Sequence, residues 1–434
     1  MRGLRAVVLT ACAALAAVLV TGGVAADASW DAVRDHSAPR VTSATGLYFA
    51  LNDMDAQIAN QLLAGDAPSL ARTRADAARV YEQRRVEAAG YLRDLAAAAA
   101  GDPAGEREVA GVIADFGAYE ELAARALALG RTAEYRNASH LMRTRLLPEA
   151  DALVTANDRA FEHTYRDALG RAAWARAALI GTGLALLAVL VALQVHLAGR
   201  FRRVVNPGAA GATLLVLAVT VVGAAGTGTQ RHDLDVARRD AFDSVLALTR
   251  ARAVAYDANA DESRYLLDRA HAGAQEAAFL GKSQRLLRVP GATIGTYATG
   301  LDDVRVADGA TGFFGDEFRN ITFPGERAAA GRVLDRYRAY QRDDRTIRTL
   351  ARSGRHTEAV AYCTGYAPGE SNHDFAELDT ALRDVIAINM SAYERASADG
   401  ARGALPLPLG LAGGVAAAAG LVLLGLRPRL AEFR

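Results

Sequence analysis

Two short stretches of the chain carry side chains of the types that bind metal ions. His356, Cys363 and His373 lie near one another, but their spacing fits no standard zinc pattern, so we interpret them as ordinary helix and loop residues. The sequence Asp-Ala-Asn-Ala-Asp at 257–261 copies the start of a calcium loop, but it lacks the turn-forming glycine and falls in a helical pattern. We therefore predict a solvent-exposed polar helix face there, and no metal or other cofactor.

Other chemistry is not indicated by the sequence. It contains no phosphate-binding loop and no nucleophile motif, and its 8 histidines are scattered. The formal net charge of +1 provides no basic field that would attract nucleic acid. The two cysteines, Cys12 and Cys363, fall in an apolar and a polar stretch, so a disulfide-built fold is excluded. We predict a protein that is neither an enzyme nor a nucleic-acid binder.

The apolar residues of the chain are concentrated in four stretches. The chain is 51% hydrophobic and 23% charged, and the two classes separate along it. Four segments have the roughly 20 mostly apolar residues needed to cross a membrane: 4–26, 174–198, 208–228 and 405–426. We expect an all-α membrane protein with four transmembrane helices. The first span is also compatible with a cleaved signal peptide that ends near Ala26.

Arginines flanking the spans predict the orientation. They precede the first span, follow the last one in the tail 427–434, and occur three times in the link 199–207. Short arginine-rich loops stay in the cytoplasm, so both termini and this link are expected inside. The two long segments between spans, 27–173 (the first block) and 229–403 (the second block), are then extracytoplasmic. The expected location is the cell membrane, with a multi-pass topology.

The two halves of the chain resemble each other. Four short motifs recur in the same order, which predicts an internal duplication in which each half reads span, block, span. The matched pairs are Asp31–Arg34 with Asp235–Arg238, Asp53–Ala56 with Asp257–Ala260, Gly130–Glu134 with Gly354–Glu358, and Asn157–Glu162 with Asn389–Glu394.

Both blocks have the pattern of helical bundles. Good helix formers dominate, and apolar residues recur at three- and four-residue spacing, as at Leu47, Leu51 and Met54. Breaks rich in Gly and Pro divide the first block into four helices, and Pro148 is expected to kink the fourth. The expected domains are thus two tandem four-helix bundles similar to the sensor modules of bacterial chemoreceptors.

The second block has further breaks at 289–326 and 364–371. The first of these contains four phenylalanines, Phe313, Phe314, Phe318 and Phe323. Three interpretations are open for them: anchors at the membrane interface, packing beneath the bundle, or a surface for a partner.

The turns at the far end of each bundle are the predicted partner-binding surface. They contain Gly65, Asp66, Pro68, Ser69, Gly130 and Arg131 in the first block, and Asp268, His271, Gly354 and Arg355 in the second. These residues would also be explained as helix caps and turns alone. The predicted cytoplasmic output surface consists of Arg200, Phe201, Arg202 and Arg203, which are equally well explained as a topology signal that contacts membrane lipid.

Two segments resemble a known family. Residues 48–63 (YFALNDMDAQIANQLL) and 314–326 (FGDEFRNITFPGE) are similar to GlnX, a group of four-span membrane proteins of actinobacteria. The resemblance implies two partners. One is an extracytoplasmic solute-binding lipoprotein of the GlnH type, which binds aspartate and glutamate, and the other is a soluble serine/threonine kinase of the PknG type.

The expected function is a transmembrane signalling receptor. It would read an extracytoplasmic amino-acid signal through the lipoprotein and relay it to the kinase by helix movement. Because one chain supplies both halves, it would work as a covalent pseudo-dimer. The main alternative is a direct small-molecule sensor with a pocket between bundle helices. A transporter accessory subunit ranks third, because the spans lack central ionisable residues.

Overall fold

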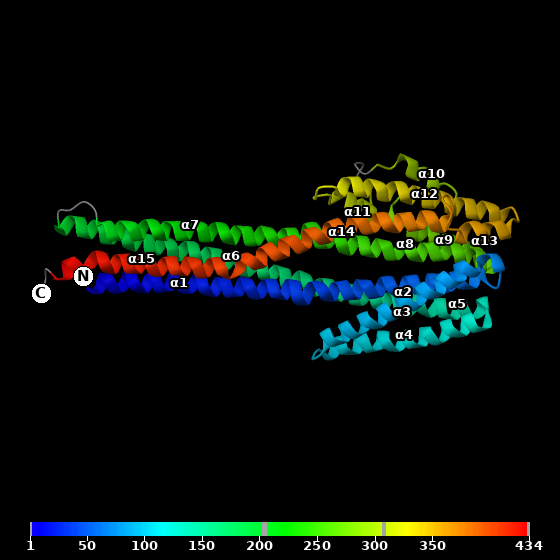
Figure 1. The fold of residues 1–434 in the computed structure, drawn as a ribbon, viewed down its shortest axis with the longest axis horizontal. Coiled ribbons are helices and arrows are strands. Elements are labelled where there is room, and N and C mark those ends of the chain that lie inside the picture. Colours follow the sequence, from blue (N-terminus) through cyan, green and yellow to red (C-terminus); the bar gives the residue numbers. More distant parts are fainter. Residues whose placement is uncertain (1, 202–205, 306–309, 432–434) are drawn as a thin grey trace. The chain divides into compact units, whose positions relative to one another are not determined.

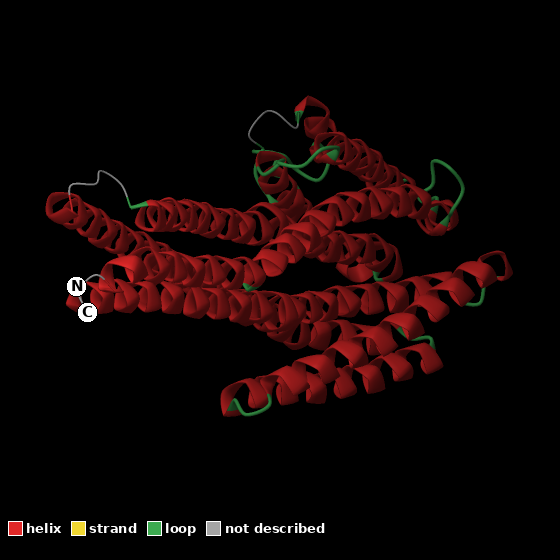
Figure 2. Ribbon diagram, turned by 60° about the vertical axis from the view of Figure 1, so that its left-hand side comes forward, coloured by secondary structure: helices red, strands yellow, loops and turns green. Residues whose placement is uncertain are grey.

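Nearly all of the described chain is helical. The computed structural model describes residues 2–201, 206–305 and 310–431; these are 90% helical and include no strand (Figure 2). Four long helical segments are apolar enough over part of their length to cross a membrane: Gly3–Ala64, Thr132–Gly199, Pro207–Leu267 and Ser371–Leu426. The predicted all-α membrane protein with helical bundles is thus confirmed.

The chain forms two compact units, and each combines segments from both sequence halves. One, which we call the span unit, comprises Met1–Ala38, Ala160–Arg238 and Tyr393–Arg434. The other, the polar unit, comprises Pro39–Arg159 and Arg239–Ala392. Most of the first and second blocks therefore belongs to a single unit.

The apolar core of the span unit is formed by residues of α1 (Arg2–Asp31), α6 (Leu147–Phe201), α7 (Pro207–Asp235) and α15 (Pro406–Ala431). They run side by side in Figure 1 and share one apolar core. The start of α7 lies against the end of α15, because the Asn206 amide donates to the Gly425 carbonyl over 3.0 Å. The start of α1 lies at this same end of the unit (Figure 1), as the predicted alternation of spans requires. The side of the membrane that this end faces stays a prediction.

A π-helical segment follows the matched aspartate in each half of the chain. One segment, η1 (Ala32–Ser37), begins directly after Asp31, and the other, η4 (Val236–Phe242), begins directly after Asp235. Such segments are rare and appear mostly as single turns within α-helices. Their recurrence at matched positions supports the internal duplication.

The first block contributes four helical arms to the polar unit, as its breaks predict. They are α2 (Ala38–Ala64), α3 (Ala71–Ala99, preceded by the short η2, Pro68–Leu70), α4 (Pro103–Leu129), and α5 (Thr132–Leu141) continuing through η3 (Met142–Leu146) into α6. Gly65 and Gly130 end helices with φ of +51° and +61°. The fourth arm stays helical through Pro148, and the π-helical η3 directly precedes the helix turn that contains this proline. The expected kink at Pro148 stays a prediction.

The second block repeats this plan with an insertion. Its helices are α8 (Asp243–Leu267), η5 (Arg269–His271), α9 (Ala272–Leu286), α10 (Tyr297–Gly300), η6 (Leu301–Asp303), α11 (Phe313–Arg319), α12 (Glu326–Arg352), α13 (His356–Thr364) and α14 (Ser371–Ala404). The short elements α10, η6 and α11 occupy the predicted break at 289–326.

The phenylalanines of this insertion pack into the bundle. Phe314 and Phe318 are buried in one apolar core with residues of α8, α9, α12 and α14, and Phe314 meets the Tyr337 ring edge-on at 5.1 Å. Phe313 is half-buried against the same core, and Phe323 is half-buried. Of the three interpretations, packing beneath the bundle therefore holds for Phe314 and Phe318.

Truncation of Phe314 tests this packing. We expect Phe314→Ala to lower the free energy of unfolding of the polar unit by about 3–5 kcal/mol, because a fully buried ring leaves a cavity. Phe323→Ala, in the same segment but half-exposed, serves as the control and should cost less. Chemical denaturation of the full chain in lipid nanodiscs measures both, and equal losses would contradict the burial of Phe314 in the bundle core.

Candidate functional site

The centre of the polar unit is the contact between α2 and α8, the helices that carry the matched motifs at 53–56 and 257–260. Phe49 on α2 meets the Tyr256 ring on α8 edge-on, with ring centroids 5.0 Å apart. Further along, the Ser263 hydroxyl donates to the Asn60 side-chain oxygen over 2.6 Å. Matching helices of the two halves thus pack on each other within one chain.

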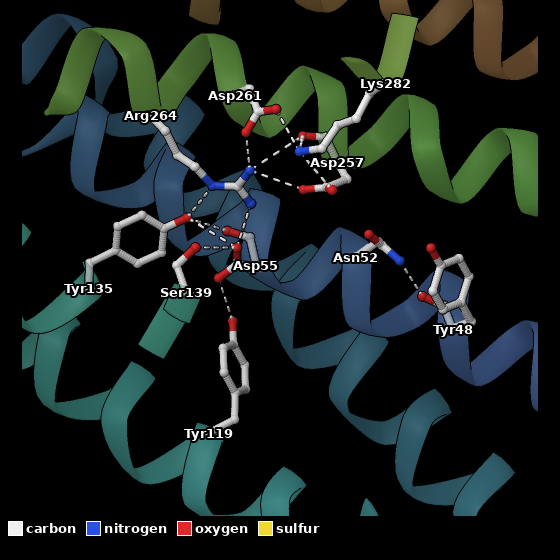
Figure 3. A network of polar contacts seen from close by, with 10 residues as sticks. All are labelled: Tyr48, Asn52, Asp55, Tyr119, Tyr135, Ser139, Asp257, Asp261, Arg264 and Lys282. Carbon is white, nitrogen blue, oxygen red and sulfur yellow. Dashed lines mark hydrogen bonds and ion pairs between the residues drawn. The ribbon is translucent and has the colours of Figure 1, made fainter. Parts of the chain in front are cut away.

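Arg264 occupies the middle of this contact (Figure 3). Its side chain is only 3% exposed, and its guanidinium group lies 2.5 Å from the Asp55 carboxylate on α2. It also lies 2.5 Å from Asp261 and 3.0 Å from Asp257, both on α8. One arginine on the second half therefore binds carboxylates of both halves.

Asp55 is surrounded by donors from the first block. The hydroxyls of Tyr119 and Tyr135 each donate to its carboxylate over 3.3 Å, and that of Ser139 donates over 3.1 Å. Arg264 itself donates to the Tyr135 oxygen over 3.0 Å. A buried carboxylate requires hydrogen-bond partners, and Asp55 finds them on three other helices. The junction therefore also ties α4 and α5 to α2 and α8 (Figure 3).

The single lysine of the chain completes the junction. Lys282 on α9 lies 2.7 Å from the Asp257 carboxylate and 2.5 Å from that of Asp261. Burial opposes the charge on Asp257, but Lys282 and Arg264 outweigh it and hold the pKa of this carboxyl well below its usual range. We call Asp55, Asp257, Asp261, Arg264 and Lys282 the charged junction.

The prediction of a solvent-exposed face at 257–261 is therefore wrong. Asn259 and Asp261 are buried, and Asp257 is mostly covered. The charges can be buried because cations from elsewhere, Arg264 one turn later and Lys282 on the next helix, neutralise them. The carboxylates in this calcium-like spacing bind two cationic side chains of the chain itself.

A second polar cluster ties α8 to α12 and α14. The buried Glu262 carboxylate accepts a hydrogen bond of 3.0 Å from the Ser371 hydroxyl. Burial, and then the charge of Asp344, raise the pKa of Glu262 well above its usual value. Arg348 donates to both oxygens of Asp344 over 2.6 and 2.8 Å and stacks on the Tyr265 ring at 4.6 Å. Movement of α8 therefore disturbs contacts throughout the second block.

The predicted tip residues lie at turns or helix ends, and their role in binding a partner stays a prediction. Gly354 has a φ of +80°, Asp66 pairs with Arg74, and Arg355 pairs with Glu358. Pro68 and Ser69 lie in η2, Gly130 caps α4, and Arg131 precedes α5.

Contacts between the two blocks unite these turns. Arg136 of the first block lies 3.6 Å from the carboxylate of Asp268, which also binds His271. Leu63 and Leu70 pack against a buried cluster around Val360 in the second block. Turns of the first and second blocks thus form one continuous surface.

The predicted output residues cannot be placed in the same way. Arg202 and Arg203 lie outside the described residues. Arg200 and Phe201 form the last turn of α6, and their side chains lie outside the described part of the chain.

The charged junction was missed by reasoning from the sequence. Two signals were present: Lys282 is the only lysine, and Asn52, Asp53 and Asp55 interrupt the apolar stretch of their helix. Neither signal indicates that Asp55 meets Arg264, because the two residues are far apart in the sequence.

Comparison with known proteins supports a sensory role. Residues 29–166, which make up most of the first block, match a family model described as an actinobacterial sensor domain. No curated protein and no solved structure matches the chain. The family match supports an actinobacterial sensor membrane protein.

Replacing Arg264 tests the energetic role of the charged junction. We expect Arg264→Met to lower the free energy of unfolding by about 3–5 kcal/mol, because it leaves buried carboxylates without their cation. Arg93→Met removes a side chain that is 79% exposed and should change stability by less than about 0.5 kcal/mol. Denaturant titration of the full chain distinguishes the two, and a loss at Arg264 no larger than at Arg93 would rule out an energetic role for the junction.

Proposed function

We propose that this protein is a transmembrane signalling receptor for external aspartate or glutamate. In this proposal a solute-binding lipoprotein of the GlnH type delivers the amino-acid signal to the polar unit. The receptor has no catalytic activity of its own and relays the signal to a cytoplasmic serine/threonine kinase of the PknG type. The sensor-domain match supports the sensory part, and the GlnX-like segments 48–63 and 314–326 support the choice of partners.

The observation that carries this proposal is that the charged junction joins two helices which are continuous with spans. One unbroken helical segment, Gly3–Ala64, contains the first span and Asp55. Another, Pro207–Leu267, contains the third span and Arg264. A partner that alters the α2–α8 contact thereby acts on two spans at once, and shifts of about 1–2 Å along such helices are a known means of signalling.

The tip turns are the surface on which we place the lipoprotein. They belong to both blocks, so one bound partner touches both halves of the pseudo-dimer. Arg131 and Arg355 are exposed there, and Asp66 is fully exposed. A partner seated on this surface changes how the halves meet at the junction beneath it. A homodimer of the receptor is not needed for this mechanism.

Capture from native membranes tests the proposal. We expect a solute-binding lipoprotein to copurify with the full chain more strongly when L-aspartate or L-glutamate is present. Arg131→Glu should weaken capture and the amino-acid response of kinase phosphorylation about tenfold or more, because charge reversal at a contact opposes docking. Arg107→Glu, an exposed arginine at the other end of α4, is the matched control. Equal capture by the two variants, or capture that ignores both amino acids, would refute the proposal.

One cavity favours the alternative of direct sensing. A cavity of about 570 Å³ lies between the start of α3 and the segment Thr364–Tyr366 of the second block. Its lining includes Arg72, which has no carboxylate partner among the described residues, and Asp76, which pairs with Arg79 over 3.4 Å. Small-ligand sites typically have volumes of about 300–1,000 Å³. Two guanidinium groups and one carboxylate complement an amino acid with two carboxylates and one ammonium group.

The cavity is also connected to α8. Cys363, next to the lining residue Thr364, has its sulfur 3.9 Å from the Ser263 oxygen. At the other end of the same loop, Ser371 binds Glu262. A ligand that moves this loop would thus pull on two neighbouring residues of α8.

Calorimetry on the purified full chain separates direct sensing from sensing through a partner. If sensing is direct, L-aspartate or L-glutamate binds without any lipoprotein, and Arg72→Gln weakens binding about tenfold or more, since a charged hydrogen-bonding partner is lost. Arg93→Gln, on the same helix but remote from the cavity, should leave affinity unchanged. Absence of heat with both amino acids would eliminate direct sensing and leave sensing through the lipoprotein in place.

A further inference from the structure

A buried carboxyl group without a hydrogen-bond partner lies in the insertion of the second block. Glu317 on α11 is 2% exposed, and neither of its carboxyl oxygens accepts a hydrogen bond of normal geometry. It borders a cavity of about 210 Å³ that is also lined by Asp243, Ser244, Asp316 and Asn320. A buried ionised carboxylate without partners is strongly disfavoured, so this group is expected to hold a proton.

The neighbouring carboxyl group, Glu326, has hydrogen-bond donors for both of its oxygens. Its two oxygens accept hydrogen bonds from the main-chain N–H groups of Thr322 (2.7 Å) and Phe323 (2.9 Å) and from the Asn389 amide (2.6 Å). Burial raises the pKa of Glu317 to about 8; the nearby Glu326 charge adds to the effect, and Ser244 and Asn389 offset part of it. Glu317, the member of the pair without hydrogen-bond partners, is therefore the one that favours binding a proton.

The proton lies next to the contact that fastens α11 to the π-helical η4. Asn320, directly after α11, donates its side-chain N–H groups to the Asp240 carbonyl (3.2 Å), the Arg239 carbonyl (3.5 Å) and the Ser244 hydroxyl (2.8 Å). These two carbonyls belong to η4, where a π-helical turn departs from the regular α-helical hydrogen-bonding pattern. Asn320 thus binds two main-chain carbonyls of η4, and its position depends on α11 staying packed.

We propose that Glu317 and Glu326 form a proton-binding site through which the receptor reads external pH as a second signal. The external location of the site rests on the proposed orientation, whereas the site itself does not depend on the amino-acid signal. When the Glu317 carboxyl loses its proton to water in the adjoining cavity, two buried carboxylates lie side by side and repel each other. Glu317 then turns toward the cavity, α11 loosens, and Asn320 releases the η4 carbonyls.

The sign of the effect follows from the raised pKa. The folded state binds the Glu317 proton more tightly than the unfolded chain does, so this proton stabilises the α11 contact fully below the ordinary glutamate range. The stabilisation is lost as the pH rises toward and through about 8.

Other charged groups surround the pair. Arg239 and Asp243 line the cavity from η4 and α8, and Asp316 lines it from α11, where Arg319 pairs with it. Arg285 on α9 stacks on Phe313 at 6.0 Å. None of these supplies a hydrogen bond of normal geometry to Glu317 among the described residues.

Two measurements on the full chain in nanodiscs test the proposal, from about pH 6 to about pH 10. Infrared spectra of the unchanged chain minus those of Glu317→Gln should show a protonated-carboxyl band that disappears as the pH rises. Taking this difference removes the bands of other buried carboxyl groups such as Glu262 and Asp343. Hydrogen exchange of the peptide containing 313–326, corrected for its intrinsic pH dependence, should accelerate up to about tenfold per pH unit across the transition. Glu317→Gln should stay protected throughout, because the amide cannot ionise. Asp316→Asn, at the adjacent exposed position, is the control and should retain the transition.

The following outcomes would also test whether Glu317 and Glu326 form a proton-binding site. Corrected exchange that is flat with pH in the unchanged chain, or a transition that survives in Glu317→Gln, would overturn the proposal. If Glu317→Gln does not fold, Glu326→Gln replaces it: the transition should move to lower pH, because the neighbouring charge is gone, and an unmoved transition refutes the pair. Both measurements need neither lipoprotein nor kinase, so their failure leaves the amino-acid proposal standing.

Discussion

Three aspartates on two helices, two of them fully buried, share one arginine and one lysine, and the arrangement of the polar unit follows from this sharing. A charge cannot remain buried without a partner, so Asp55 on α2 and Arg264 on α8 have to stay together. Such a junction contributes modestly to net stability, because desolvation offsets most of the attraction. Its larger effect is on specificity: only one register of α2 against α8 brings Asp55 to Arg264.

The junction also shows what duplication within one chain makes possible. In the alignment of the two halves, Asp55 corresponds to Asn259, and Arg264 corresponds to Asn60. The symmetric counterpart of the Asp55–Arg264 pair would therefore be two asparagines, and no such ion pair forms there. Two identical subunits would have to carry both charges at both positions. A fused pair can place the acid in one half and the base in the other, which makes the contact asymmetric and fixes which half provides which partner.

The π-helical segments η1 and η4 are places where the long helices can rearrange their main-chain hydrogen bonds when contacts in the polar unit change. Each of η1 and η4 lies where the chain passes from the residues of one unit to those of the other. A π-helical turn accommodates an extra residue and leaves main-chain groups in weaker geometry, so its hydrogen bonds rearrange more readily than those of a regular helix. In the second half Asn320 binds two main-chain carbonyls of η4 from outside the helix. In our proposal the proton of the buried Glu317 beside it controls this contact.

The sequence by itself determined the features that depend on neighbours along the chain. Apolar runs of sufficient length gave the four spans, three- and four-residue periodicity gave the bundle helices, and Gly65, Gly130 and Gly354 gave the turns. The repeated motifs gave the duplication, and matching π-helical segments support it.

Tertiary structure decided whichever features depend on partners far away in the chain. From the sequence alone, a polar helix face such as 257–261 is expected to be exposed to solvent, because charged residues are normally exposed. Its burial is possible only because Lys282 approaches it and Arg264 links it to Asp55. The same holds for Phe314, whose burial depends on Tyr337, and for the tip turns, which become one surface only when the two blocks pack. Spacing along one helix specifies which residues share a face, but the chemistry of the opposing face is supplied by the fold.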